Sequence, residues 1–175
     1  MAYTTINKST DYFNTKLYTG NGSTQAITGV GFQPDWVWLK DRTDGDNHQW
    51  YDVVRGVTKS LQCNTTNGEI TFSDGLTAFG TDGFTLGSND QHNGSSDNFA
   101  AWCWRGANAQ GSSNTDGTIN TTYTSVNTTA GFSICQYTGY ESGTQTVGHG
   151  LGVAPKLILI KQTSSNSLNF VMYHH

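Results

Sequence analysis

The sequence predicts an all-β protein: an antiparallel β-sandwich of jelly-roll-like form, built as a tandem repeat whose second copy is incomplete. Short apolar stretches between Gly-rich and Asp-Gly turns predict strands, and helix-forming stretches are almost absent. The 21 glycines and the many Thr, Asn and Ser residues fit a chain with numerous turns. Many short strands with regular turns are typical of sandwiches and jelly rolls.

Apolar and aromatic runs place the strands of the first unit. In chain order we expect strands at residues 13–18, 32–40, 49–54, 70–72, 84–86 and 99–105. Turns such as Thr81-Asp82-Gly83 separate them, because an Asp-Gly pair reaches a positive φ at low cost. The strand at 32–40 is apolar on both faces, with Phe32, Trp36 and Trp38 expected near one face, so it should be central in its sheet.

A second copy of the sequence begins near Gly131. Tyr18-Thr19-Gly20 recurs as Tyr137-Thr138-Gly139, and the apolar stretch 36–40 recurs as 157–161, which gives a repeat of about 120 residues. Whether residues 132–137 pair back onto the first sheet stays open. Residues 157–160 need a partner strand from the first unit, from another subunit or from residues outside this sequence.

These patterns divide the chain into four parts. They are an N-terminal arm at 1–12, a first β-sandwich repeat at 13–105, a Gly/Ser/Asn/Thr-rich linker or long hairpin at 106–130, and a partial second repeat at 131–175.

Composition excludes several function classes. The net charge is −4 and the nine Lys and Arg residues are scattered, so we expect no nucleic-acid partner. No apolar run approaches the roughly 20 residues of a membrane helix, so we expect no membrane insertion. Glu69 and Glu141 are the only glutamates and lie in different repeats, and no Ser-His-Asp or Cys-His pattern is legible. We therefore expect no enzyme activity and no cofactor.

Two polar loops, 41–47 and 89–97, are the candidate contact regions. Asp41, Asp44, Asp46 and Asn47 share one loop, as in a Ca²⁺ site, but no Glu follows at the spacing of a calcium loop. We therefore expect a solvated turn there and no metal ion. Contacts to a glycan or a protein partner are expected from Asp44, Asp46, Asn47, Trp50, Tyr51, Asn89, Asp90 and Asn93.

Two tryptophan pairs at i, i+2 spacing allow two interpretations. Trp36 and Trp38 share one strand face, as do Trp102 and Trp104. Such pairs can form an aromatic platform for sugar rings. Because aliphatic residues are few, we favour the other interpretation, a buried core where two sheets meet.

The chain resembles a repeat family of β-sandwich domains in tail-fibre-like and other virion proteins of tailed, especially marine, bacteriophages. The stretches that carry the resemblance are YTGNGSTQAITGVGFQPDWVWLKDR, DGFTLGSND, NFAAWCWRG, NTTAGFSICQYTG and VGHGLGVAPKLILIK. The resemblance spans almost all of residues 1–175 and implies a fold related to concanavalin-like lectin domains. It supplies no catalytic or binding residues.

The resemblance implies a structural virion protein, assembled in the host cytoplasm. We expect a tail fibre or fibre-like protein that contributes to host attachment or anchors a fibre to the particle. Expected partners are other phage structural proteins (a tail adaptor, nozzle or capsid protein), further copies of the chain, most simply in a trimer, and a host surface glycan. A capsid decoration or head-fibre protein is one alternative, and a glycan-degrading enzyme of the phage tail is another.

Overall fold

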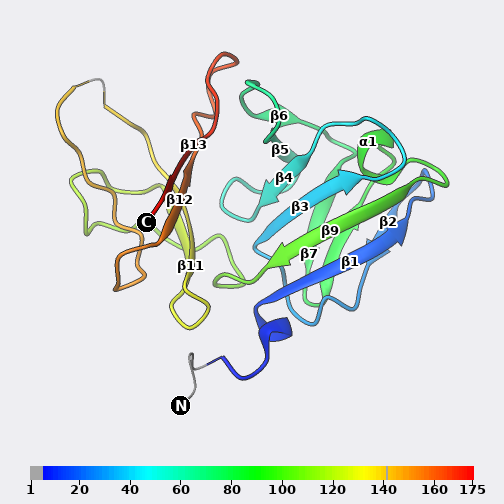
Figure 1. Ribbon diagram of the computed structural model, residues 1–175, viewed down its shortest axis with the longest axis horizontal. Helices are drawn as coiled ribbons and strands as arrows, with labels where there is room; N and C mark the ends of the chain where they lie inside the picture. The colour runs from blue at the N-terminus through cyan, green and yellow to red at the C-terminus, as the bar shows by residue number, and fades with distance from the viewer. Residues whose placement is uncertain (1–5, 141) are drawn as a thin grey trace.

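The protein is an all-β sandwich followed by two β-hairpins, as a computed structural model covering residues 6–140 and 142–175 describes it (Figure 1). The larger sheet has the order β1 (Phe13–Thr19), β9 (Asn98–Trp104), β3 (Trp36–Asp41), β4 (Gln49–Asp52), β5 (Lys59–Gln62) and β6 (Ile70–Thr71). The smaller sheet has the order β2 (Gln25–Ile27), β8 (Gly83–Leu86) and β7 (Leu76–Gly80). The described helices are a 3-10 turn, η1 (Ser9–Asp11), and one short helix, α1 (Asp90–Asn93).

The two sheets pack through alternate residues of their strands. Val37 and Leu39 of β3 and Ala101 and Cys103 of β9 point inward and are fully buried. They meet residues of the smaller sheet, including Phe84 of β8, in one apolar cluster. Alternation along a strand sends every second side chain to the same face, so this cluster is the core of the sandwich.

All five tryptophans lie on the other face of the larger sheet. Trp36 pairs across the sheet with Trp104, and Trp38 lies between Trp50 and Trp102 in the pairing register. Trp36 stacks on Trp104 with ring centroids 4.2 Å apart. The expectation that the tryptophan pairs fill the space between the two sheets was therefore wrong. Aliphatic residues and Tyr51, Phe84 and Phe32 fill it instead.

The position of Phe32 also differs from the expectation. Phe32 lies in the core between the sheets, opposite to Trp36 and Trp38. The strand begins only at Trp36, and the preceding residues around Pro34 are not extended strand, so the alternation cannot be carried back through them. The expected central position is confirmed, because β3 lies between β9 and β4.

The part after residue 105 forms two separate two-stranded sheets. β10 (Tyr123–Asn127) pairs with β11 (Phe132–Gln136), and β12 (Leu157–Ile160) pairs with β13 (Val171–His174). β10 lies within the range 106–130 expected to be a linker or long hairpin. Because β11 pairs with β10, it does not extend the larger sheet of the first unit.

The second hairpin repeats the first in structure. In the first, Leu39 pairs with Gln49, and in the second, Ile160 pairs with Val171. The connecting segments are 40–48 and 161–170, so the second is one residue longer. The expectation that residues 157–160 need a partner from the first unit, another subunit or outside the sequence was therefore wrong, because β13 of the same copy pairs with them. The surroundings differ: β3 lies between two strands, whereas β12 has β13 as its partner within the described chain and its four residues are exposed.

The second part covers some of the outer tryptophan face. Phe132 of β11 stacks parallel to Trp36, and Phe170 packs edge-on against Trp50. The segment before Phe170 also bonds to the first unit, since the Glu69 N–H donates to the Thr163 carbonyl at 2.7 Å and the Gly68 N–H donates to Asn166 Oδ1 at 2.8 Å. The outer aromatic face is therefore partly an internal joint between the two units.

Candidate functional site

The two candidate loops lie side by side at one end of the sandwich. The loop 42–48 leaves β3 after Asp41, and the loop 87–97 enters β9, which pairs antiparallel with β3 so that Asp41 faces Phe99. The Arg42 N–H donates to the Asn98 carbonyl at 2.7 Å. The Asn98 N–H donates to Thr43 Oγ1 at 2.8 Å. Strand pairing and these two bonds join the loops into one surface.

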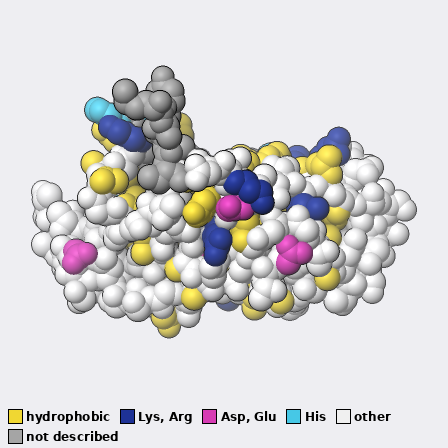
Figure 2. Space-filling model, turned by 90° about the horizontal axis from the view of Figure 1, so that it is seen from below, with side chains coloured by type: hydrophobic (Ala, Val, Ile, Leu, Met, Phe, Trp, Pro, Cys, Tyr) yellow, Lys and Arg dark blue, Asp and Glu magenta, His cyan; other side chains and the backbone are white. Residues whose placement is uncertain are grey.

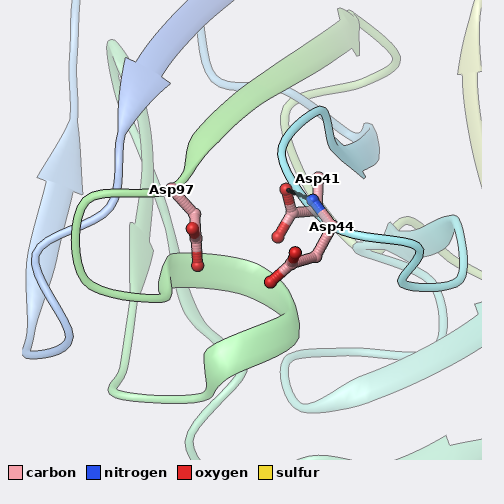
Figure 3. A group of neighbouring side chains, drawn as sticks. All are labelled: Asp41, Asp44 and Asp97. Carbon is pink, nitrogen blue, oxygen red and sulfur yellow. Dashed lines mark hydrogen bonds between the residues drawn. The ribbon is translucent and has the colours of Figure 1, made fainter.

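Three carboxylates from these loops converge. Asp41, Asp44 and Asp97 each place an oxygen within 4.8 Å of the others. In Figure 3 the side chain of Asp41 extends from the end of β3, that of Asp44 extends from the loop after it, and that of Asp97 faces them from the segment between α1 and β9. Asp41 is buried, Asp97 is half-buried and Asp44 is exposed. The group therefore has a closed inner side and an open outer side.

The buried carboxylate of Asp41 is only half satisfied. Its Oδ1 accepts the N–H groups of Thr43, at 2.7 Å, and of Asp44, at 3.0 Å. Its Oδ2 is buried and has no hydrogen-bond partner in the described structure. Buried carboxylate oxygens normally have a partner, because losing water without replacement costs free energy.

The surrounding charge is mostly negative. Burial, followed by the negative charges of Asp41 and Asp44, raises the pKa of Asp97 above its usual value. The pKa of Asp46 is raised by burial and then by the same neighbours. Lys40 is nearby, but its ammonium donates to the main-chain carbonyls of Asp44 and Asp46, at 3.2 and 2.9 Å.

Within residues 6–140 and 142–175, none of the three converging aspartates forms an ion pair. Carboxylate oxygens are hard donors that suit Ca²⁺ or Mg²⁺ and accept hydrogen bonds from hydroxyl groups. The group can therefore bind a hard cation or a polyhydroxylated molecule.

Several expected contact residues do lie at this end of the sandwich. Asp44 and Asp90 are exposed, and Asp46, Asn47 and Asn89 are half-buried. Asn47 is already engaged, since its amide donates to Gln62 Oε1 and its Oδ1 accepts from Asn64. Asp44 and Asp90 are thus the expected residues that are most open to a ligand.

Three expected contact residues are buried and have structural roles. Tyr51 is fully buried in the core, and its hydroxyl lies 2.7 Å from Nε2 of His92. Asn93 is also fully buried, and its side-chain amide donates to the main chain of neighbouring loops. Trp50 is buried against Trp36 and Phe170. None of them can meet a glycan in this structure.

Asp97 is the residue that sequence reasoning missed. It closes the candidate loop 89–97, but it was not singled out because it follows Asp41 by more than fifty positions. Gly94 allows its approach, since a Cβ there would collide with Oδ2 of Asp97. The one available indication was that Asp97 belongs to the polar loop 89–97, which was already a candidate contact region.

Comparison with known proteins places the chain in a family. Residues 8–175 match the family described as a domain of unknown function, DUF7483. The chain belongs to this family. No curated protein and no solved structure matches it. The DUF7483 description assigns no activity.

In the described part of the DUF7483 chain, Glu69 lies beside two cations and not beside a second glutamate. Glu69 forms ion pairs with Arg55 and Lys59, at 3.4 and 3.8 Å, and is thereby held in the first unit. Glu141 lies outside the described residues. None of the helices in the described part of the chain has the length and apolar character needed to cross a membrane.

Proposed function

We propose that the chain is a non-enzymatic structural protein of a tailed bacteriophage particle, a tail fibre or fibre-like protein. The observation that carries the proposal is the repetition of one sandwich hairpin, β3–β4 and then β12–β13, along a single chain. Repeated β units suit elongated surface structures, because each copy packs mainly against its neighbours. The sequence resemblance to virion proteins supports the same proposal.

The proposed role at the particle surface is host attachment through a glycan. The end of the sandwich with Asp44 and Asp90 supports this role, because exposed carboxylates and amides accept and donate hydrogen bonds to sugar hydroxyls. Figure 2 views the molecule from below, where Lys or Arg and Asp or Glu side chains lie against one another near the middle and most of the remaining surface is uncharged.

Anchoring is the competing role within the same proposal. In that case the chain docks onto a tail adaptor, nozzle or capsid protein, or decorates the capsid as a head fibre. The exposed apolar residues of β12 and β13, among them Ile158 and Val171, favour a protein contact of some kind. The position of the chain in the intact particle separates attachment from anchoring.

We also propose that the chain acts as a homo-oligomer, with a trimer favoured. The occupant of the free edge of β12 is then a second copy of the chain. Leu157–Ile160 itself carries no charge or proline, so the usual protection against pairing with another strand is confined to the flanking Pro155, Lys156 and Lys161. Closed symmetry would protect all equivalent edges at once.

Purified particles test the proposal. Mass spectrometry of gradient-purified virions should detect the chain in fixed proportion to the major capsid protein, and a cryo-EM map should place it. Absence from the particles would refute the proposal. If the chain projects into solvent, a glycan array and blocking of phage adsorption by the isolated chain test attachment. Sugar release from host polysaccharide by the isolated chain would establish the enzyme alternative.

A further inference from the structure

We propose that Asp41, Asp44 and Asp97 form a Ca²⁺ site that joins the loop after β3 to the loop before β9. This departs from the expectation of no metal ion, which considered only the spacing within one loop. The site goes beyond the proposed structural role and does not depend on it.

One carboxylate oxygen of Asp41 is buried without a hydrogen-bond partner. Asp41 is 1% exposed and its Oδ2 has no hydrogen-bond partner in the described structure, although its Oδ1 has two. The carboxylate points toward those of Asp44 and Asp97 (Figure 3). A buried carboxylate oxygen directed at two more carboxylates, none of them ion-paired with a described Lys, Arg or His, lacks the partner that its burial requires.

The spacing of the three carboxylate oxygens fits one Ca²⁺ ion. The three oxygens lie within 4.8 Å of one another. Oxygens bound to one Ca²⁺ ion at about 2.4 Å can be separated by up to about 4.8 Å, the diameter of the coordination shell. A small movement of the exposed Asp44 side chain is enough to complete the contact, whereas Asp41 is already fixed by its bonds to the main chain.

The arrangement of the ligands favours Ca²⁺ over Mg²⁺. Mg²⁺ requires near-ideal octahedral geometry and loses its bound water reluctantly. Ca²⁺ accepts irregular sets of roughly six to eight oxygen ligands. Three carboxylates, one from the end of β3 and two from irregular loops, open to water on the side of Asp44, fit Ca²⁺. With water supplying the remaining ligands, we expect a dissociation constant of about 10⁻⁴–10⁻³ M, the range of extracellular Ca²⁺ modules.

The expected consequence is a calcium-dependent stabilisation of one end of the sandwich. Without the ion, the three carboxylates repel one another across the joint between the loops. With it, the joint is held by the ion as well as by the Arg42–Asn98 and Asn98–Thr43 hydrogen bonds. A ligand that binds only the folded state raises its stability with concentration.

Calorimetric titration of the whole chain with CaCl₂ tests the site directly. We expect saturable binding by the original chain, and at least about tenfold weaker binding by Asp97→Asn and Asp41→Asn, since one ligand charge is lost. Asp116→Asn is the matched control, because Asp116 is an exposed aspartate outside both loops. Asp97→Asn keeps the test valid if Asp41→Asn does not fold, which circular dichroism reports.

Thermal unfolding gives an independent test, because Asp97→Asn should change the melting temperature differently in EDTA and in CaCl₂. In EDTA, Asp97→Asn should melt at the same temperature as the original chain or higher, because a repulsive charge is removed. In CaCl₂, the original chain and Asp116→Asn should gain stability and Asp97→Asn should not. Absence of saturable Ca²⁺ binding up to about 10 mM, or unchanged binding by Asp97→Asn, would overturn the site. Tighter binding of MgCl₂ would overturn the choice of calcium. Neither result involves glycan or virions, so the proposed function is judged separately.

Discussion

The hydroxyl of Tyr51 lies 2.7 Å from Nε2 of His92, and both side chains are fully buried. Nδ1 of His92 lies 2.5 Å from Oδ1 of Asn89. The neutral ring satisfies both contacts when Nδ1–H donates to Asn89 and Nε2 accepts from Tyr51. A second proton would turn Nε2 into a donor facing a hydroxyl and would leave a charge in the core.

This pair predicts a loss of stability in mild acid. Burial lowers the pKa of His92 to about 4, partly offset by the negative charge of Asp74. The unfolded chain therefore binds more protons than the folded one between about pH 6.5 and 4, and stability falls as the pH is lowered through that window. Titration of His92 costs the folded state nothing above about pH 6.5, and the loss in free energy of unfolding reaches roughly 3 kcal/mol below about pH 4.

Urea unfolding at a series of pH values measures this effect. His92→Gln should lower stability at pH 7 but should flatten its decline between about pH 6.5 and 4, since no imidazole remains to titrate. His174→Gln, at an exposed position, is the control and should leave the decline unchanged. An equally steep decline in His92→Gln would show that another group is responsible.

Asn93→Ala should weaken the fold by about 1–3 kcal/mol, because it leaves the buried carbonyl of Gly87 without its donor. The amide of Asn93 donates to the carbonyls of Ser23 and Gly87, and its Oδ1 accepts the Asn21 N–H at 3.1 Å. Chemical unfolding measures the change. Ser95→Ala, at an exposed position of the same loop, should change stability by less than about 0.5 kcal/mol. A stable Asn93→Ala protein would contradict the assigned structural role.

Phe170→Ala should loosen the segment 161–170 without unfolding the sandwich. The ring centroid of Phe170 lies 4.7 Å from that of Trp50, at an interplanar angle of 68°. We expect a cost of about 1–2 kcal/mol, from the lost edge-to-face contact and buried area. Hydrogen exchange should accelerate in residues 161–175 and stay slow in β3 and β9. Leu168→Ala, at an exposed position, is the control. If Phe170→Ala and Leu168→Ala show the same hydrogen-exchange pattern, the Phe170–Trp50 contact does not hold the segment.

Leu159→Lys should convert the proposed oligomer into monomers. The substitution places a charge in the middle of the exposed strand β12, where pairing with a second copy would bury it. Native mass spectrometry of the original and variant chains measures the change. Thr15→Lys, on the exposed face of the edge strand β1, is the matched control. An original chain that is monomeric at all concentrations would contradict the oligomer.

The sequence allowed the fold class and the main strands to be predicted, because aromatic and apolar runs such as those in β3 and β9 are local features. The strands β2, β5, β7, β10 and β13 were not predicted. β10 alternates Tyr, Thr, Ser and Val with little apolar excess, and β7 pairs through a register shift between Leu76 and Ala78. Their extended form comes from pairing with neighbouring strands, a tertiary effect that local patterns do not contain.

Part of the candidate site could also be predicted from local features of the sequence. The loop 41–47 was recognisable from its carboxylates, but the approach of Asp97 depends on the pairing of β3 with β9. Tyr51 and Asn93 were taken for surface residues because polar groups are usually exposed. In the structure, hydrogen bonds to His92, Ser23 and Gly87 allow them to be buried.

Because every tryptophan lies on one side of the larger sheet, tryptophan fluorescence reports on the outer face of that sheet and not on the core between the sheets. The core between the sheets contains Phe84 and Tyr51 but no tryptophan within the described residues. Tryptophan emission therefore reports the covering of the outer face by Phe132 and Phe170, and not the integrity of the inner core. If the covering segments detach before the sheets separate, fluorescence and far-ultraviolet dichroism will give different melting curves. Such a mismatch would mean that the chain unfolds in more than one cooperative unit.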